Sequence, residues 1–210
     1  MTKRLKSKFR ICKKLNRNYN NIWGLPKGDS LRSVQKIEKR KKKKASLYGK
    51  LLGVKQSFRF FYCNLQEKSF KRILKKSVNS PLTTLDRFVS FLESRLDVVL
   101  FRSCFVSSMY NARQLINHGI VQVNGKVVRN PGTTLNQLDI IEIDENLLKH
   151  ETKIDKIRND VKKNFSSRFL PPYLEIDYKT LSIVFLWDPN YKSAYYPIKA
   201  NYNIIQRFYR

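Results

Sequence analysis

The sequence predicts an α+β protein with three parts: a mostly helical domain, a small module of two helices packed on short antiparallel strands, and an extended basic N-terminal arm. Three observations support this prediction. Positive charge gathers near the N-terminus, apolar residues then recur at intervals of three and four, and strict alternation replaces that spacing after Gly119.

Positive charge dominates the composition. The 210 residues include 43 Lys and Arg against 16 Asp and Glu, a formal net charge of +27. Residues 1–80 hold 25 of these cations and only 3 acids, so they carry a net +22 and the rest of the chain only +5. A protein this cationic repels itself and needs a polyanionic partner, for which nucleic acid is the usual candidate.

The N-terminal arm, residues 1–44, ends in six consecutive cations: Lys39, Arg40, Lys41, Lys42, Lys43 and Lys44. This run fits a solvated face, a membrane-surface or import signal, or a contact with an RNA or DNA backbone. We favour the backbone contact, because six adjacent cations cannot share one helical face and each lysine releases counterions at a phosphate. Leu5, Phe9 and Cys12 fit either an organellar presequence or a short helix lying on phosphates, and we favour the second.

Several other classes of protein are disfavoured. The longest apolar run, Ile183–Trp187, is far shorter than the roughly 18 residues that span a bilayer. The 3 cysteines are scattered and indicate reduced thiols, since they form neither a disulfide framework nor a zinc pair. With only 2 histidines present, we expect no metal and no cofactor, and we also expect no membrane partner and no small-molecule substrate.

Residues 45–81 are expected to form the helical domain. Apolar residues from Leu47 to Phe58 lie at intervals of four, three and four, which is one face of a helix. Residues 146–169 are interpreted as a charged helical insertion. The C-terminal segment, residues 170–210, begins with a pair of strands and is expected to pack on the helical domain and complete it.

Residues 82–145 are expected to form the small module. Thr83 and Asp86 resemble a capping box at the start of a helix over residues 84–97, whose apolar stripe faces inward. Four residues lie opposite that stripe: Arg87, Ser90, Glu93 and Ser94. The loop that follows is expected to lead into a second helix.

Ser107 or Ser108 is expected to cap the second helix, and His118 occupies its last turn before Gly119. Alternating apolar residues then flank Asn124-Gly125, the strongest short signal for a hairpin, because both residues tolerate a positive φ. A third strand follows within residues 138–143.

Five motifs in this module stand in a recognisable order: Leu85-Asp86-Arg87, Arg95-Leu96-Asp97-Val98-Val99-Leu100, Ala112-Arg113-Gln114-Leu115-Ile116, His118-Gly119-Ile120-Val121 and Val123-Asn124-Gly125-Lys126-Val127-Val128. This order resembles the S-four RNA-binding fold. Tyr48-Gly49 and Pro172-Tyr173-Leu174 resemble the parts that flank this fold in the S-four family of small-subunit ribosomal proteins, and Met109 after two serines resembles its mitochondrial members. The resemblance implies a structural constituent of the small ribosomal subunit that binds its rRNA, contacts neighbouring ribosomal proteins and helps to nucleate assembly.

The candidate rRNA-binding residues comprise the cations of the arm and eight residues of the module: Arg40, Lys41, Lys42, Lys43, Lys44, Arg87, Arg95, Ser107, Ser108, Arg113, His118, Asn124 and Lys126. Arg87, Arg113 and Lys126 are the cations expected to reach phosphates, and the two serines mark a helix N-terminus, which favours anions. Structural roles remain open for three others: Arg95 pairing with Asp97 or capping the first helix, His118 ending a helix, and Asn124 serving the turn.

Catalysis is not expected. Arg95-Leu96-Asp97 is similar to the aspartate motif of pseudouridine synthases, which share the fold, but here it lies inside the module and no large domain to hold a flipped base is expected after residue 145. The alternatives are an S-four RNA-modification or ribosome-associated factor and a generic basic nucleic-acid-packaging protein. The scarcity of Ala beside abundant Lys, Asn, Ile, Phe and Tyr favours a mitochondrion-encoded protein without a cleaved presequence, with a plastid or a bacterial cytoplasm as alternatives.

Overall fold

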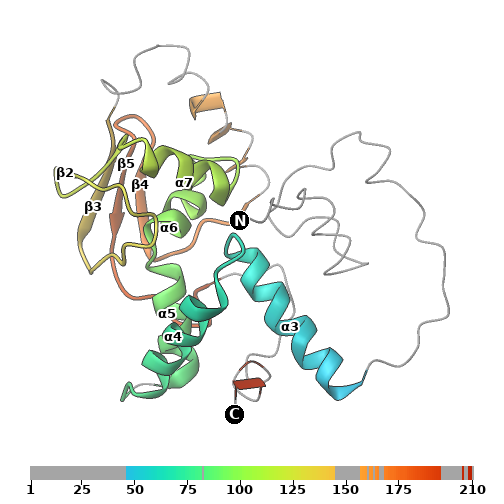
Figure 1. Ribbon diagram of the computed structural model, residues 1–210. Helices are drawn as coiled ribbons and strands as arrows, with labels where there is room; N and C mark the ends of the chain where they lie inside the picture. Colours follow the sequence, from blue (N-terminus) through green and yellow to red (C-terminus); the bar gives the residue numbers. More distant parts are fainter. Residues whose placement is uncertain are drawn as a thin grey trace, which may run out of the picture. The chain divides into compact units, whose positions relative to one another are not determined.

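A computed structural model describes residues 46–81, 83–144, 157–159, 161–162, 164–165, 168–194, 205 and 208–209 (Figure 1). The N-terminal arm lies outside the described residues, and so does most of the segment predicted as an insertion. The chain divides into two compact units, one of residues 1–67 with 196–210 and the other of residues 68–195. No helix among the described residues is long and apolar enough to cross a bilayer.

The described part of the first unit is built on α3 (Leu47–Phe61), which Ser46 caps by accepting a hydrogen bond from the backbone N–H of Gly49. Lys55 is buried, and its ammonium lies 3.0 Å from the Glu67 carboxylate and 3.9 Å from the centre of the Phe208 ring. The Tyr209 hydroxyl also donates to Glu67, so residues near the C-terminus contact this helical unit.

Four helices of the second unit lie wholly within the described residues: α4 (Glu67–Val78, whose first residue belongs to the first unit), α5 (Thr84–Glu93), α6 (Leu96–Arg102) and α7 (Met109–Asn117). Thr83 caps α5, as its sequence predicts, and also bonds the Asp86 carboxylate. Phe70 on α4 meets Phe88 on α5 edge-on, with ring centroids 5.4 Å apart. Both rings are buried and join the two helices.

The helix predicted over residues 84–97 is wrong at its C-terminal end. It stops at Glu93, Arg95 is extended, and α6 begins at Leu96, within a segment expected to end the helix and form a loop. The chain breaks here because two of its backbone groups bond the loop after the hairpin: Ser94 accepts from Leu135, and Leu96 donates to Thr133.

The side of α5 predicted to be polar is also buried. Ser90, Glu93 and Ser94 are at most 5% exposed, although they lie opposite the apolar stripe. Glu93 is fully buried because the Arg102 guanidinium and the Tyr173 hydroxyl both bond its carboxylate. A paired carboxylate therefore occupies the core where the sequence suggested a solvent face.

The sheet of this unit has five antiparallel strands in the order β2-β1-β3-β5-β4. Their bounds are β1 (Val121–Val123), β2 (Lys126–Val127), β3 (Asp139–Ile143), β4 (Leu174–Asp177) and β5 (Ser182–Phe185). The predicted hairpin and third strand are present. Helices α6 and α7 lie on one side of the sheet in Figure 1.

The two C-terminal strands differ from the expectation that residues 170–210 complete the helical domain. Strand β5 pairs with β3, so residues 174–185 extend the sheet of the module instead. Their apolar residues, of which Ile183 and Phe185 are fully buried, find their partners in the core of the second unit. The sequence shows that these residues alternate, but it does not show which strand they pair with.

Candidate nucleic-acid interface

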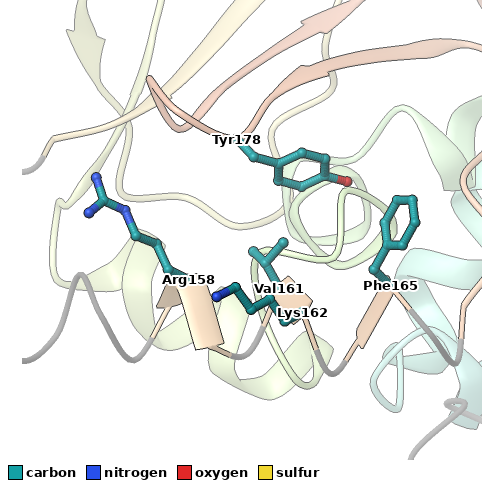
Figure 2. A pocket seen from close by; sticks show the side chains of 5 residues that line it. All are labelled: Arg158, Val161, Lys162, Phe165 and Tyr178. Carbon is teal, nitrogen blue, oxygen red and sulfur yellow. The ribbon is translucent and has the colours of Figure 1, made fainter.

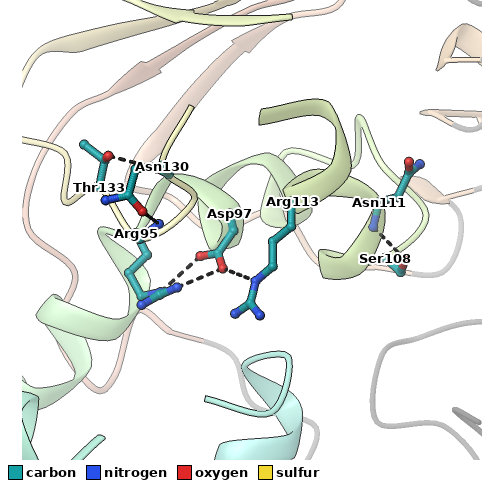
Figure 3. Close-up of polar contacts among 8 residues, drawn as sticks. Arg95, Asp97, Ser108, Asn111, Arg113, Asn130 and Thr133 are labelled. Carbon is teal, nitrogen blue, oxygen red and sulfur yellow. Dashed lines mark hydrogen bonds and ion pairs between the residues drawn. The ribbon is translucent and has the colours of Figure 1, made fainter. Parts of the chain in front are cut away.

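Asp97 is the centre of a cluster of three charged side chains in the module (Figure 3). Its carboxylate is 1% exposed and accepts hydrogen bonds from two guanidinium groups. Arg95 binds it with two nitrogens, at 3.1 and 2.9 Å, and Arg113 Nε lies 2.8 Å away. Two cations share one carboxylate, so the cluster keeps a net positive charge.

The end of the Arg113 side chain points away from Asp97 in Figure 3. Its side chain is 26% exposed and Arg95 only 11%, so Arg113 is the more accessible of the two cations. Arg113 lies on α7 between the buried Ala112 and the exposed Gln114, where an arginine covers apolar neighbours with its stem and presents its charge at the surface. A guanidinium held at Nε by a carboxylate is oriented in advance for a phosphate.

The backbone around this cluster is held by the loop after the hairpin. Asp97 N–H donates to the carbonyl of Pro131, and Asn130 accepts at Oδ1 from Gly132 N–H and at its carbonyl from the Thr133 hydroxyl. A Cβ on Gly132 would lie 3.7 Å from the Arg95 guanidinium, in ordinary contact. The Asn130–Thr133 turn therefore lies next to the Arg95 guanidinium.

The start of α7 is a well-formed helix N-terminus. Ser108 is its N-cap and accepts a hydrogen bond from Asn111 N–H at 3.3 Å, which resolves the choice between two serines. The Ser107 carbonyl accepts from Arg168, whose guanidinium also binds the carbonyls of Phe101 and Val106. Arg168 is a residue that sequence reasoning missed, because nothing near it in the chain reveals three carbonyl partners more than sixty residues away.

The hairpin turn is built as the sequence predicts, with φ of +51° at Asn124 and +73° at Gly125. The Asn124 amide donates to Asp139 and its oxygen accepts from Ile140 N–H, so this side chain ties the turn to β3. The structure therefore gives Asn124 a structural role. Lys126, at the start of β2, is exposed beside the turn.

Two other candidate residues, His118 and Arg87, make contacts that do not involve the Asp97 cluster. His118 is the exposed C-cap of α7, and its backbone N–H donates to Gln114. Arg87 pairs with Asp188 at 2.9 Å, and its guanidinium lies 4.9 Å from the centre of the Phe91 ring. The remaining candidates, Arg40 and Lys41–Lys44, fall outside the described residues.

A hollow of about 580 Å³ lies where the described part of segment 157–165 meets Tyr178 (Figure 2). Exposed Arg158 and Lys162 line one side, and Phe165 meets the Tyr178 ring edge-on at 6.3 Å. Burial raises the pKa of Tyr178 to about 12, with Cys104 adding to the shift, so its hydroxyl stays protonated and donates to the Ser103 carbonyl. These contacts attach this segment to the module.

Helices on one side of an antiparallel sheet, together with two arginines around a buried carboxylate, define a small nucleic-acid-binding module. Residues 94–141 match the family described as the S4 domain. Similarity extends well beyond the module. The small ribosomal subunit protein uS4 of Ruegeria sp. (strain TM1040) is 32% identical over 212 residues, covering 100% of this chain and 98% of the relative. The proteins of the same name from Caulobacter vibrioides (strain NA1000 / CB15N) and Phenylobacterium zucineum (strain HLK1) are 32% and 31% identical, each covering 100% of this chain and 99% of the relative. The chain belongs to the family of the small ribosomal subunit protein uS4.

Proposed function

We propose that this chain is a structural constituent of a small ribosomal subunit, where it binds small-subunit rRNA, contacts neighbouring ribosomal proteins and helps to nucleate assembly. The observation that carries this proposal is the similarity to uS4 proteins along the whole chain. Ribosomal proteins of this family are structural, so the chain is not an enzyme.

The geometry supports a surface centred on α7 and the adjacent turn. Arg113 contacts a phosphate while the Asp97 carboxylate, itself bound by Arg95, holds its Nε in place, and the N-terminus of α7 at Ser108 supplies partial positive charge. Lys126 adds a flexible cation next to this surface. Such a surface recognises folded RNA by its backbone and shape, because the major groove of A-form RNA does not admit side chains.

The basic arm adds affinity to this surface. The cations from Arg40 to Lys44 neutralise phosphates and release counterions, which makes binding steeply dependent on salt. The mitochondrial ribosome is the proposed location, supported by only four alanines beside abundant Lys, Asn, Ile, Phe and Tyr. The relatives named above come from bacteria, so a bacterial cytoplasm is the alternative. Mass spectrometry of purified mitochondrial ribosomes decides between them.

Binding of the full chain to small-subunit rRNA, measured at several salt concentrations, tests the function. Arg113→Gln is expected to lower the affinity about fivefold to tenfold and to reduce the slope of log K against log salt by about 0.9. Lys179→Gln is the matched control, because Lys179 is an exposed cation in the turn between β4 and β5. It is expected to change neither value appreciably.

Two outcomes would contradict this assignment. Duplex DNA that competes as well as structured rRNA would favour a general packaging protein. An Arg113→Gln variant that keeps its circular dichroism spectrum and binds rRNA with unchanged slope would remove Arg113 from the surface.

A further inference from the structure

The face of the sheet opposite α6 and α7 carries two rows of side chains that the register defines. One row crosses all five strands: Val127, Gln122, Glu142, Ser182 and Asp177. The second row consists of Ile140, Val184 and Glu175 on β3, β5 and β4. Successive residues of a strand point to opposite faces, so these eight residues share one face, called here the outer face.

The alternate residues of the same strands form the buried face. Val121, Ile141, Ile183 and Phe185 are all 0% exposed, so this face of the sheet is turned to the core. Figure 1 shows α6 and α7 on one side of the sheet, and packed helices are what bury a sheet face. The outer face is correspondingly accessible: Val127 is 49% exposed and Ile140 is 43% exposed. Leu138, directly before β3, is 69% exposed.

The outer face is acidic, although the chain as a whole is strongly basic. Glu142, Glu175 and Asp177 are all exposed, and none of the eight residues is a cation. Glu142 and Asp177 lie two strands apart, at about 10 Å, and Glu175 lies about 7 Å from Asp177 along β4. Each apolar residue of the second row therefore has a carboxylate beside it: Glu142 follows Ile140 along β3, and Glu175 pairs with Val184 across β4 and β5.

Most of the acids that the structure describes elsewhere in this unit already have partners. Glu93 binds Arg102, Asp97 binds two arginines and Asp188 binds Arg87. Among the residues that the structure describes, the side chains of Glu142 and Glu175 have neither an ion pair nor a hydrogen bond. Their charge is uncompensated, so it repels phosphates and attracts cations.

We propose that the outer face docks an extended, Lys/Arg-rich segment of a neighbouring small-subunit protein. The carboxylates of Glu142, Glu175 and Asp177 pair with its cations, and apolar residues between those cations cover Ile140 and Val184. The module then has two working sides: α7 and the hairpin turn face rRNA, and the outer face holds protein. This inference rests on the proposed ribosomal function, and it specifies the charge and sequence character of one protein neighbour.

Photocross-linking within assembled small subunits tests the docking. A benzophenone side chain replaces Ile140 in the full chain, and the cross-linked products are identified by mass spectrometry. We expect a cross-link to a Lys/Arg-rich peptide of another protein. The double variant Glu142→Lys, Glu175→Lys is expected to lower its yield at least about fivefold, while the affinity of the free chain for rRNA does not fall.

A comparison of two double variants shows whether the cross-link depends on the outer face itself or only on the net charge of the chain. Glu142→Gln with Glu175→Gln raises the charge of the chain by the same amount as Asn79→Lys with Asn190→Lys, at exposed positions outside α7, the hairpin turn and the sheet. Only the first pair is expected to weaken the cross-link, and its neutral, similarly sized side chains keep the sheet folded. Equal effects of the two pairs would overturn the proposal, as would cross-links to rRNA, to the chain's own basic arm or to a second copy. A wild-type chain that does not bind rRNA would contradict the ribosomal function instead.

Discussion

Replacing Glu93 by Gln provides a sharp test of the buried network between α5, α6 and the segment before β4. Glu93 is 0% exposed and the Arg102 side chain is 7% exposed, so both charges are withdrawn from water. Arg102 binds the carboxylate through two nitrogens at 3.0 and 2.8 Å, and the Tyr173 hydroxyl donates to it at 2.8 Å. Burial is the main cause that raises the pKa of Tyr173 well above its ordinary value, and the negative charge of Glu93 adds to the shift. The phenol therefore stays protonated and remains a hydrogen-bond donor.

The Glu93→Gln variant keeps the shape of the side chain but removes the negative charge that Glu93 places against the buried Arg102 guanidinium. Breaking a buried pair in this way costs about 3–5 kcal/mol of unfolding free energy. For a chain of this size, this cost corresponds to a fall in Tm of about 6–20 °C. Urea unfolding of the full chain, followed by far-ultraviolet circular dichroism, measures the free energy directly.

Two further variants show whether the reasoning is correct. Tyr173→Phe removes one hydrogen bond but leaves the ion pair, so it is expected to cost only about 1.5–3 kcal/mol. Glu93→Leu with Arg102→Met removes both charges together, and it is expected to be more stable than Glu93→Gln, because no buried charge is left without a partner. A Glu93→Gln variant that loses less than about 1 kcal/mol, or a double variant less stable than it, would refute the account.

Three further predictions concern single positions. Ser108→Ala removes the cap of α7 and is expected to lower the unfolding free energy by about 1 kcal/mol in urea titrations. Gly125→Ala is expected to lower the unfolding free energy by about 1 kcal/mol, because φ is +73° there but nothing lies within 4 Å of the new Cβ. Gly119→Ala is expected to lower it further in the same titrations, because its Cβ would also lie 3.3 Å from Arg129 and Val127. Hydrogen bonds from the Thr83 hydroxyl and then the Tyr191 N–H lower the pKa of Asp86 below 3.8, so its contribution is complete above pH 3.8 and is lost as the pH falls through the lower folded value. Asp86→Asn is therefore expected to flatten the fall in stability below about pH 4, and an unchanged acid profile would contradict this.

Local signals in the sequence were sufficient to predict much of the module. The capping pair at Thr83, the serine cap of α7 and the Asn124–Gly125 turn each depend on residues within a few positions of one another, and all three are present in the structure. The break between α5 and α6 left no such signal. Leu92 and Leu96 are four apart and both buried, so the apolar stripe runs through the break without interruption.

Long-range pairing explains most of the remaining differences. The position of β5 beside β3 depends on contacts such as that between Ile141 and Ile183, and the orientation of Arg113 depends on a carboxylate sixteen residues earlier. Pairing of Arg95 with Asp97 was one of two structural roles expected from the sequence, and the structure shows this pair but adds Arg113 to the same carboxylate. Spacing along a chain does not reveal which of several cations a buried acid selects.

The position of β5 also affects how the protein is made. During synthesis, β1, β2 and β3 leave the exit tunnel about 40 residues before β5 does, and β3 has an open edge for that interval. An unpaired edge beside apolar Ile141 is a template for wrong pairing with other nascent chains. The last strand of the sheet to be translated, β5, therefore covers the open edge of β3 in the middle of the sheet.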